Sequence, residues 1–374
     1  MSLERCFLLD TTLREGEQFA TARFTSSQRL AIAEALDAFG VEYIELTSPA
    51  ASPQSARDLE LIARHGLRAR ILAHVRCHLD DVRLAVEHGA QGVNLLYATS
   101  AQLRQASHGR SLDQIVEEAA KVIAYLHGHQ VEIRFSCEDT FRTELHELIR
   151  IYRAVAALGI ERIGLADTVG IATPRQVYDV VAQVRREVDC DIEFHGHNDA
   201  GCAIANAFCA LEAGATHIDV TVLGIGERNG IASLGGMVAR LATFNPDLVA
   251  RYDLTLLPEL DRMLAEMVGV SIPFDAPISS PYAFHHKAGL HTKAVLADPR
   301  SYEVLDPAAF GRTRTVAVAH RLVGWHAIAE RARELGIYLN EAAAREAAAR
   351  IKALGDEHEL DSTSVDEILY EYAE

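Results

Sequence analysis

The sequence repeats one unit eight times along its first 230 residues. Short apolar runs alternate there with longer stretches that have the period of an amphipathic helix. The apolar runs begin at residues 6, 41, 68, 92, 131, 162, 191 and 217. Near-continuously apolar strands joined by helices are typical of a parallel sheet. Eight such units predict an α/β fold in which residues 1–275 form a closed (β/α)8 barrel of the TIM type.

An open, doubly wound sheet fits the first strand less well. A dinucleotide-binding sheet has the pattern GxGxxG directly after this strand. The chain has DTTLREGE there instead, at residues 10–17.

The character of the chain changes near residue 275. A stretch rich in Pro, His and Gly covers residues 277–307, and segments with helical period follow at 320–335 and 341–356. Residues 276–374 are therefore expected to form a mostly helical C-terminal appendage to the barrel.

Composition and charge exclude several classes of protein. The 374 residues are 49% hydrophobic with a formal net charge of −17, which disfavours nucleic-acid and anionic membrane partners. No apolar run approaches the roughly 18 residues of a membrane span. The six cysteines form no CxxC pair, and the first residues lack a secretory leader pattern. These features predict a cytoplasmic protein with reduced thiols.

Two histidines stand one residue apart in HGHND, at 195–199. On a strand, the period of two points His195 and His197 to the same side, where they could bind a divalent metal. An isolated pair of this kind is more often structural than metal-binding. A third ligand nearby makes metal binding the favoured interpretation. Glu15 or Asp10, at the end of the first strand, would neighbour the seventh and eighth strands in a closed barrel. Two histidines and one carboxylate leave coordination positions open for a substrate.

Many further polar residues fall at the carboxyl ends of the predicted strands, where barrel enzymes have their active sites. Alternation sends Arg134, Ser136 and Glu138 to one side of the fifth strand. Inward-facing polar groups are costly without ligands or partners, so their concentration predicts an active site. The motif GIGERNG, at 224–230, is interpreted as a turn into the last barrel helix, with a phosphate cradle as the alternative.

Three motifs together resemble the homocitrate synthases: DTTLREGEQ at 10–18, HGHNDAGCAIANA at 195–207 and HKAGLH at 286–291. The wider family includes isopropylmalate and citramalate synthases and the hydroxymethylglutaryl-CoA lyases. RFSCEDTFR and GIGERNG look particular to homocitrate synthases, and the resemblance runs from residue 6 to the end. It implies an acyltransferase that makes homocitrate and CoA from acetyl-CoA and 2-oxoglutarate, at the first step of lysine biosynthesis through 2-aminoadipate.

The resemblance also implies roles for individual residues. Glu15, His195 and His197 would bind a divalent metal, Mg²⁺ or Mn²⁺ first, with Zn²⁺ or Co²⁺ as alternatives. The 2-oxoglutarate site would consist of Arg14, Gln18, His74, Arg134, Ser136 and Thr168. Arg14 would also stabilise the alkoxide formed on attack, while Glu138, His291 and Tyr302 would enolise acetyl-CoA. The segment HKAGLH would reach into a neighbouring subunit, which makes 276–374 a lid and dimerisation region and the enzyme a homodimer with shared active sites.

Two positions depart from the family pattern. Ile231 stands where isopropylmalate synthases and the lyases have an Asn ligand for the metal. Asn94 stands where homocitrate synthases tend to have Asp. In the family, lysine competes for the 2-oxoglutarate pocket, and its ammonium would meet Glu45, Glu193 and position 94. Weak inhibition by lysine is therefore expected.

Other functions remain open from the sequence alone. Within the class, the alternatives are a nitrogenase-associated homocitrate synthase and an isopropylmalate or citramalate synthase. From other classes, an iron(II) and 2-oxoglutarate oxygenase would use a similar ligand set. An inactive metabolite-binding regulator would keep the pocket, but would not need Glu138, His291 and Tyr302 together.

Overall fold

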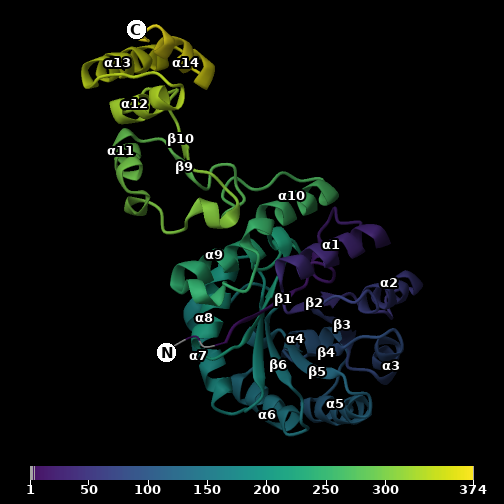
Figure 1. Ribbon diagram of the computed structural model, residues 1–374. Coiled ribbons are helices and arrows are strands. Elements are labelled where there is room, and N and C mark those ends of the chain that lie inside the picture. Colours follow the sequence, from purple (N-terminus) through teal and green to yellow (C-terminus); the bar gives the residue numbers. More distant parts are fainter. Residues whose placement is uncertain (1–2, 4, 374) are drawn as a thin grey trace. The chain divides into compact units, whose positions relative to one another are not determined.

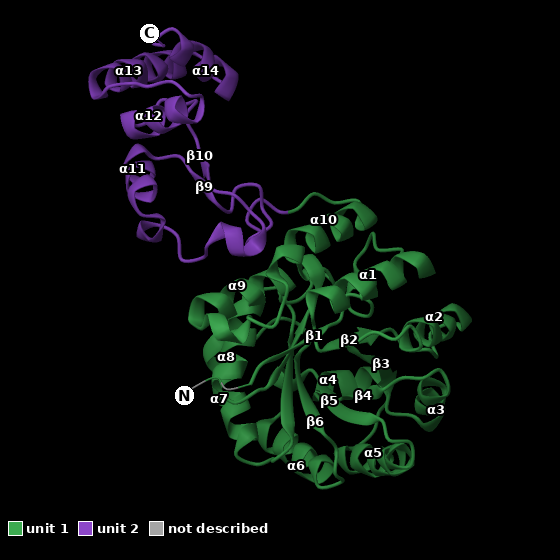
Figure 2. Ribbon diagram, in the orientation of Figure 1, with its two compact units in different colours: residues 1–272 green, residues 273–374 purple. Residues whose placement is uncertain are grey.

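A computed structural model describes residue 3 and residues 5–373. The chain divides into two compact units, residues 1–272 and 273–374, shown in Figure 2. Each unit is described by itself below.

The first unit is a closed barrel of eight parallel strands, with helices around it (Figure 1). The strands are β1 (Phe7–Asp10), β2 (Tyr43–Leu46), β3 (Arg70–Arg76), β4 (Gly92–Ala98), β5 (Glu132–Glu138), β6 (Arg162–Asp167), β7 (Asp191–Gly196) and β8 (His217–Val220). The ring closes where β1 pairs with β8, with Leu9 opposite Asp219. The predicted fold class is confirmed.

Ten α-helices belong to this unit within the described residues. They are α1 (Ser26–Phe39), α2 (Pro53–Ala63), α3 (Leu79–Glu87), α4 (Ala101–Ser107), α5 (Leu112–His127), α6 (Leu145–Ala156), α7 (Pro174–Arg185), α8 (Ala203–Glu212), α9 (Leu234–Phe244) and α10 (Leu257–Val268). Their ends follow local chemistry. At α1, Thr25 and Gln28 form a capping box, and Gly40 ends the helix in the left-handed region, at φ 106°. The turns of GIGERNG lie between β8 and α9.

Charged residues occupy part of the barrel interior, where branched apolar side chains are usual. Arg162 of β6 is 2% exposed and forms ion pairs with Glu132 of β5, at 2.8 Å, and Glu193 of β7, at 2.7 Å. Glu193 also forms an ion pair with Arg134 of β5. Charge inside the barrel is therefore paired from strand to strand.

The second unit has a small apolar core of its own. It contains β9 (His285–His286), β10 (Thr315–Val316), α11 (Gly289–Ala297), α12 (Trp325–Glu334), α13 (Glu341–Glu357) and α14 (Ser362–Tyr370). Its core is formed mainly by α12, α13 and α14, with Ile328, Ile351, Val365 and Leu369 buried.

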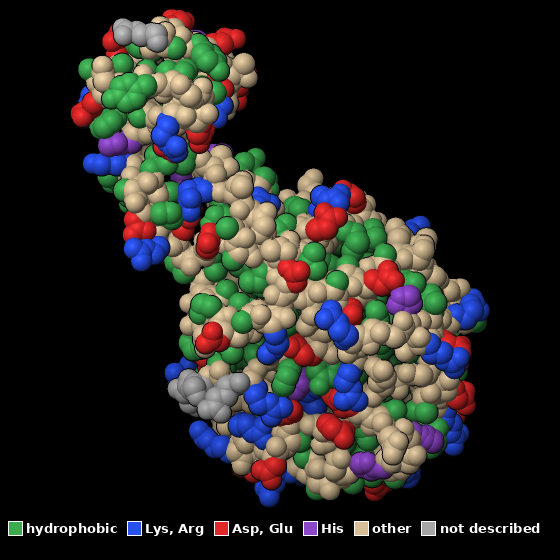
Figure 3. Space-filling model, in the orientation of Figure 1, with side chains coloured by type: hydrophobic (Ala, Val, Ile, Leu, Met, Phe, Trp, Pro, Cys, Tyr) green, Lys and Arg blue, Asp and Glu red, His purple; other side chains and the backbone are tan. Residues whose placement is uncertain are grey.

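The charges on the surface and the character of the helices are the features that bear on membrane spanning. Figure 3 shows acidic and basic side chains intermixed over the visible face of the barrel unit. Among the described residues, no helix combines the length and the apolar character that crossing a bilayer requires.

We expect Arg162→Ala to lower the free energy of unfolding of the barrel by about 3–5 kcal/mol, because it leaves buried carboxylates unpaired. Urea unfolding followed by circular dichroism measures this. Arg5→Ala is the control, because Arg5 is 59% exposed and pairs with Asp191 at 3.4 Å. That change should cost at most about 1 kcal/mol. Equal effects of the two changes would show that the interior pairs contribute no more than a surface pair.

Candidate active site

A polar cavity of about 300 Å³ lies at the carboxyl ends of the barrel strands. Its walls contain ionisable side chains from the turn after β1, from β3, β5 and β7, and from the loop after β8. The lining residues are Arg14, Glu15, Gln18, His74, Asn94, Leu96, Arg134, Ser136, Glu138, Ala166, Thr168, His195, His197, Glu227 and Arg228. Every barrel residue that the sequence analysis assigned to metal, 2-oxoglutarate or proton transfer is in this set. Glu45 and Glu193, from the expected lysine site, are fully buried and contact Arg14 and Arg134.

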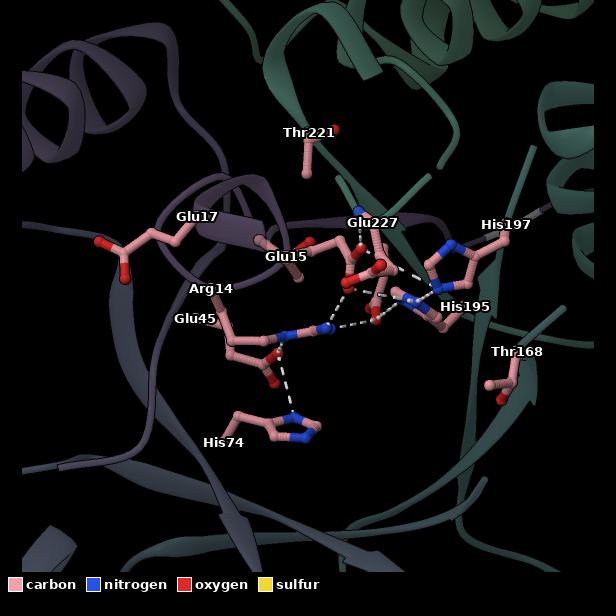
Figure 4. Close-up of polar contacts among 12 residues, drawn as sticks. Arg14, Glu15, Glu17, Glu45, His74, Thr168, His195, His197, Thr221 and Glu227 are labelled. Carbon is pink, nitrogen blue, oxygen red and sulfur yellow. Dashed lines mark hydrogen bonds and ion pairs between the residues drawn. The ribbon is translucent and has the colours of Figure 1, made fainter. Parts of the chain in front are cut away.

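Glu15, His195 and His197 come together as a candidate metal centre, as Figure 4 shows. One ligand atom from each lies within 4.8 Å of the others. The Nε2 atoms of the histidines are 3.3 Å apart, and each is 4.0 Å from a carboxylate oxygen of Glu15. Asp10, the other carboxylate left open by the sequence, is not in this group. Its Oδ1 accepts the backbone N–H of Thr12, at 2.8 Å.

The protonation of these residues suits metal binding. Burial opposes the charge of Glu15, but Arg14 and the two histidines lower its pKa to about 2. Burial also lowers the pKa of His195 well below its usual value and lowers that of His197. Near neutral pH the group is therefore one carboxylate and two neutral imidazoles, the form that binds a divalent cation.

Asp219 of β8 orients one of the histidines. Its Oδ2 is 2.9 Å from Nδ1 of His195, and both side chains are buried. A carboxylate on one ring nitrogen fixes the tautomer and turns the other nitrogen toward a metal. Sequence analysis missed Asp219, although its place in the strand HIDV is an inward-facing one.

Negative charge is in excess around the centre. Arg14 contacts Glu15, at 2.5 Å, and Glu45, at 2.7 Å, and lies 4.0 Å from Asp219. Glu193 adds a further carboxylate, which forms ion pairs with Arg134 and Arg162. A bound dication would offset this excess, so the residues present fit a divalent metal.

The side of the cavity formed by β3 to β6 carries hydrogen-bond donors. His74 has a pKa lowered by burial and by Arg14, so it is neutral. Its Nδ1 lies 2.9 Å from the amide nitrogen of Asn94. With Nδ1 accepting that bond, Nε2 carries the proton. Thr168 Oγ1 accepts the N–H of Asp139, at 2.8 Å, which leaves its hydroxyl proton for a ligand.

The fifth strand brings Arg134, Ser136 and Glu138 to the cavity, in agreement with the alternation. Its neighbour β6 makes room with Gly164, where a Cβ would lie 2.0 Å from Ser136 Oγ and 2.7 Å from Arg134 Nε. Burial and the charge of Asp139 raise the pKa of Glu138, which makes this carboxylate a stronger base.

His291 and Tyr302 belong to the second unit, so they are not among the residues that line the barrel cavity. Their ring centroids are 4.2 Å apart, with Tyr302 47% exposed. They form a contacting pair within that unit.

Family comparisons agree with the fold. The HMGL-like family model matches residues 5–264, and the model "Homocitrate synthase post-HMGL domain-like" matches residues 278–359. The Bacillus subtilis HMG-CoA lyase structure is similar with a TM-score of 0.65 at 21% identity, over 72% of this chain and 96% of that chain. This likeness shows the fold alone. Fold and family model together define a barrel enzyme of the HMGL-like class.

Curated relatives identify the family within that class. A mitochondrial homocitrate synthase of Yarrowia lipolytica is 53% identical over 98% of this chain and 82% of its own length. A homocitrate synthase of Pyrococcus abyssi is 40% identical over 83% of this chain and 85% of its own length. The chain belongs to the homocitrate synthase family, which consists of condensing acyltransferases. The predicted family and enzyme class are confirmed.

The expected cytoplasmic location is wrong as an inference from the sequence. Relatives from Yarrowia lipolytica, Schizosaccharomyces pombe, Saccharomyces cerevisiae and Penicillium rubens are named mitochondrial, and a second Saccharomyces cerevisiae relative is named a cytosolic isozyme. Composition and thiol content describe the folded units. Mitochondrial and cytosolic relatives share these units, so neither property indicates the compartment.

We expect Asp10→Asn to change how stability depends on pH. Burial raises the pKa of Asp10 from 3.8 to about 7. The folded chain therefore binds more protons than the unfolded chain between about pH 4 and 7. This carboxyl thus lowers the free energy of unfolding as pH rises through that window. Asn keeps an acceptor for Thr12 but carries no charge. The variant's free energy of unfolding, relative to that of the unsubstituted protein, should therefore be about 2–4 kcal/mol higher at pH 8 than at pH 4. If the two proteins differed in free energy of unfolding by the same amount at both pH values, the raised pKa of Asp10 would be contradicted.

Proposed function

We propose that this protein condenses acetyl-CoA with 2-oxoglutarate and water to give homocitrate and CoA, in lysine biosynthesis through 2-aminoadipate. The observation that supports this best is the cavity where Glu15, His195 and His197 adjoin Arg14, Arg134 and His74. The cavity combines a candidate metal-binding group with hydrogen-bond donors that suit a substrate with two carboxylates. Its volume of about 300 Å³ suits a small molecule.

The proposed first substrate is an oxo acid held by the donors around the metal group. A divalent metal on Glu15, His195 and His197 would polarise the 2-oxo group as a Lewis acid. Arg134 offers a planar fork for a carboxylate, and the Nε2–H of His74 and the hydroxyl of Thr168 donate further hydrogen bonds. Arg14 stabilises the negative charge that develops on the oxo oxygen during attack.

A second cavity, of about 550 Å³, suits the long arm of acetyl-CoA. It shares Leu96 and Glu138 with the first cavity, so the two meet at the raised-pKa carboxylate. Arg76, His78, His108 and Arg110 give it basic groups, which suit the phosphates of CoA. In this arrangement Glu138 takes a methyl proton from the acetyl group, the resulting enolate carbon attacks the 2-oxo carbon, and water then cleaves the thioester.

The proposed enzyme is a homodimer in which the second unit of one subunit completes the site of the other. His291 and Tyr302 would act there with Glu138 in enolisation. Leu290, directly before His291, is 73% exposed, and Val304, two residues after Tyr302, is 82% exposed. Exposed apolar side chains beside a contacting His–Tyr pair suit a surface that another subunit covers.

Weak inhibition by lysine is proposed from the surroundings of Asn94. The Asn94 amide donates to Glu45 Oε2 at 3.1 Å, and within the described residues its buried Oδ1 has no partner. That oxygen could accept from an ammonium, next to the carboxylates of Glu45 and Glu193. An Asp in its place would add a charge to the hydrogen bond, worth roughly 1.5–3 kcal/mol.

The experiment that tests the function is CoA-thiol release from acetyl-CoA with a panel of 2-oxo acids. We expect a clear preference for 2-oxoglutarate over pyruvate and 2-oxoisovalerate, and dependence on a divalent metal. Glu15→Gln, which removes a charged ligand, should abolish both metal binding and turnover while circular dichroism stays unchanged. Preference for 2-oxoisovalerate or pyruvate would instead indicate an isopropylmalate or citramalate synthase, and strict oxygen dependence an oxygenase.

Glu138→Gln and His291→Ala should keep 2-oxoglutarate binding but lose enolisation, because both residues serve the acetyl half-reaction. Wash-in of solvent deuterium into the acetyl methyl measures this step. Mixed His291→Ala and Glu15→Gln subunits should regain part of the activity through hybrid sites. Wild-type wash-in, or no complementation after confirmed subunit exchange, would contradict these roles.

Asn94→Asp should strengthen lysine inhibition by roughly one to two orders of magnitude. Lysine titrations against 2-oxoglutarate compare the variant with the unmodified enzyme, and the rate without lysine is the control. Tight inhibition of the unmodified enzyme, or no gain in the variant, would rule the idea out.

A further inference from the structure

The loop between β8 and α9 contacts the candidate metal ligands from two sides. The backbone N–H of Glu227 donates to Glu15 Oε1, at 2.7 Å. Farther along, Gly230 accepts the N–H of Asn198, at 2.8 Å, and Ile231 forms an isolated bridge with His197. The motif GIGERNG therefore links the end of β1 to the end of β7.

The glycines of this motif are required by close approach. A Cβ on Gly226 would lie 2.6 Å from Glu15 Oε1, and one on Gly230 would lie 1.8 Å from the carbonyl oxygen of Gly224. The loop folds tightly on itself and onto the carboxylate. These contacts account for the motif without a phosphate.

Arg228 fastens the same loop to two others. Its Nε and Nη2 donate to the two oxygens of Asp199, at 2.8 and 3.0 Å, and Nη2 also donates to the carbonyl of Thr168, at 2.7 Å. The loops after β6 and β7 are close here, since a Cβ on Gly170 would lie 2.8 Å from the backbone nitrogen of Asp199. One guanidinium thus joins the loops that follow β6, β7 and β8.

The backbone of Arg228 lies in the left-handed region, at φ 56°. A residue other than glycine stays there only when its surroundings hold it. Two contacts supply this restraint. The guanidinium of Arg228 donates to both oxygens of Asp199, and the backbone N–H of the preceding residue, Glu227, donates to Glu15. The strained residue therefore adjoins the metal-binding carboxylate.

We infer that Arg228 is a positioning residue for the metal centre and for Thr168, acting through its bidentate contact with Asp199. While that contact holds, the Glu227 amide keeps one oxygen of Glu15 fixed, and the Thr168 side chain keeps its place at the cavity. This inference rests on the metal site of the proposed function. Arg228 itself is 41% exposed, and exposed ion pairs add little to folding stability. Its loss should therefore affect ligand geometry more than stability.

The test measures the dissociation constant of Mn²⁺, without substrates, by calorimetry or electron paramagnetic resonance. Arg228→Ala and Asp199→Asn should each weaken Mn²⁺ binding by roughly 10-fold or more, the usual effect of losing a support of a ligand. Arg228→Lys, which keeps the charge but not the fork, should fall between. In the double variant the two losses should not add, because both break one contact.

Arg175→Ala is the matched control. Arg175 is an exposed arginine of α7 that pairs with Asp179 at 2.9 Å, in the same unit. It should leave Mn²⁺ binding and the KM for 2-oxoglutarate unchanged, whereas Arg228→Ala should raise that KM. The melting temperature should change equally little in both variants.

The outcomes separate this inference from the proposed function. Unchanged Mn²⁺ affinity in folded Arg228→Ala and Asp199→Asn, with normal affinity in the unsubstituted protein, would overturn the positioning role alone. So would a loss of affinity that merely follows a large drop in melting temperature. No Mn²⁺ binding by the unsubstituted protein would overturn the metal site and this inference with it.

Discussion

Pairing of buried charges inside a closed barrel is the constraint on which the rest of the structure depends. Arg134 and Arg162 are 3% and 2% exposed, and each forms an ion pair with Glu193. Buried charges are costly unless they are paired and hydrogen-bonded. Since β5, β6 and β7 each contribute one of these residues, none of these three strands can shift without leaving a charge unpaired. The register of the barrel and the geometry of the site are therefore set together.

The same pairing prepares the site for its ligands. Arg14 is held between Glu15 and Glu45, and Asp219 holds His195, before any ligand arrives. Groups fixed in this way need little rearrangement when charge develops on a substrate. The surplus of carboxylates also suits this cavity to a divalent cation.

Sequence patterns predicted the barrel because strand and helix periods are local properties. The alternation along β5 and β7 likewise placed Arg134, Ser136, His195 and His197 on the cavity side. The alternation could not choose between Asp10 and Glu15, because the chain leaves β1 after Asp10 and turns. Residues brought in by loops were harder still. The contacts of Arg228 depend on a left-handed backbone that no periodicity signals.

Ring closure has a consequence for how the protein acquires its site. The first and last strands of the barrel are separated by some two hundred residues, and Thr12 Oγ1 accepts the N–H of Val222 across that span. Contacts between distant parts of a chain form slowly, because the loop between them must be ordered first. Glu15 can meet His195 and His197 only when the chain as far as β7 has been made and the ends have joined. An incomplete barrel would therefore lack the candidate metal centre, and the appearance of Mn²⁺ affinity would report that the ring has closed.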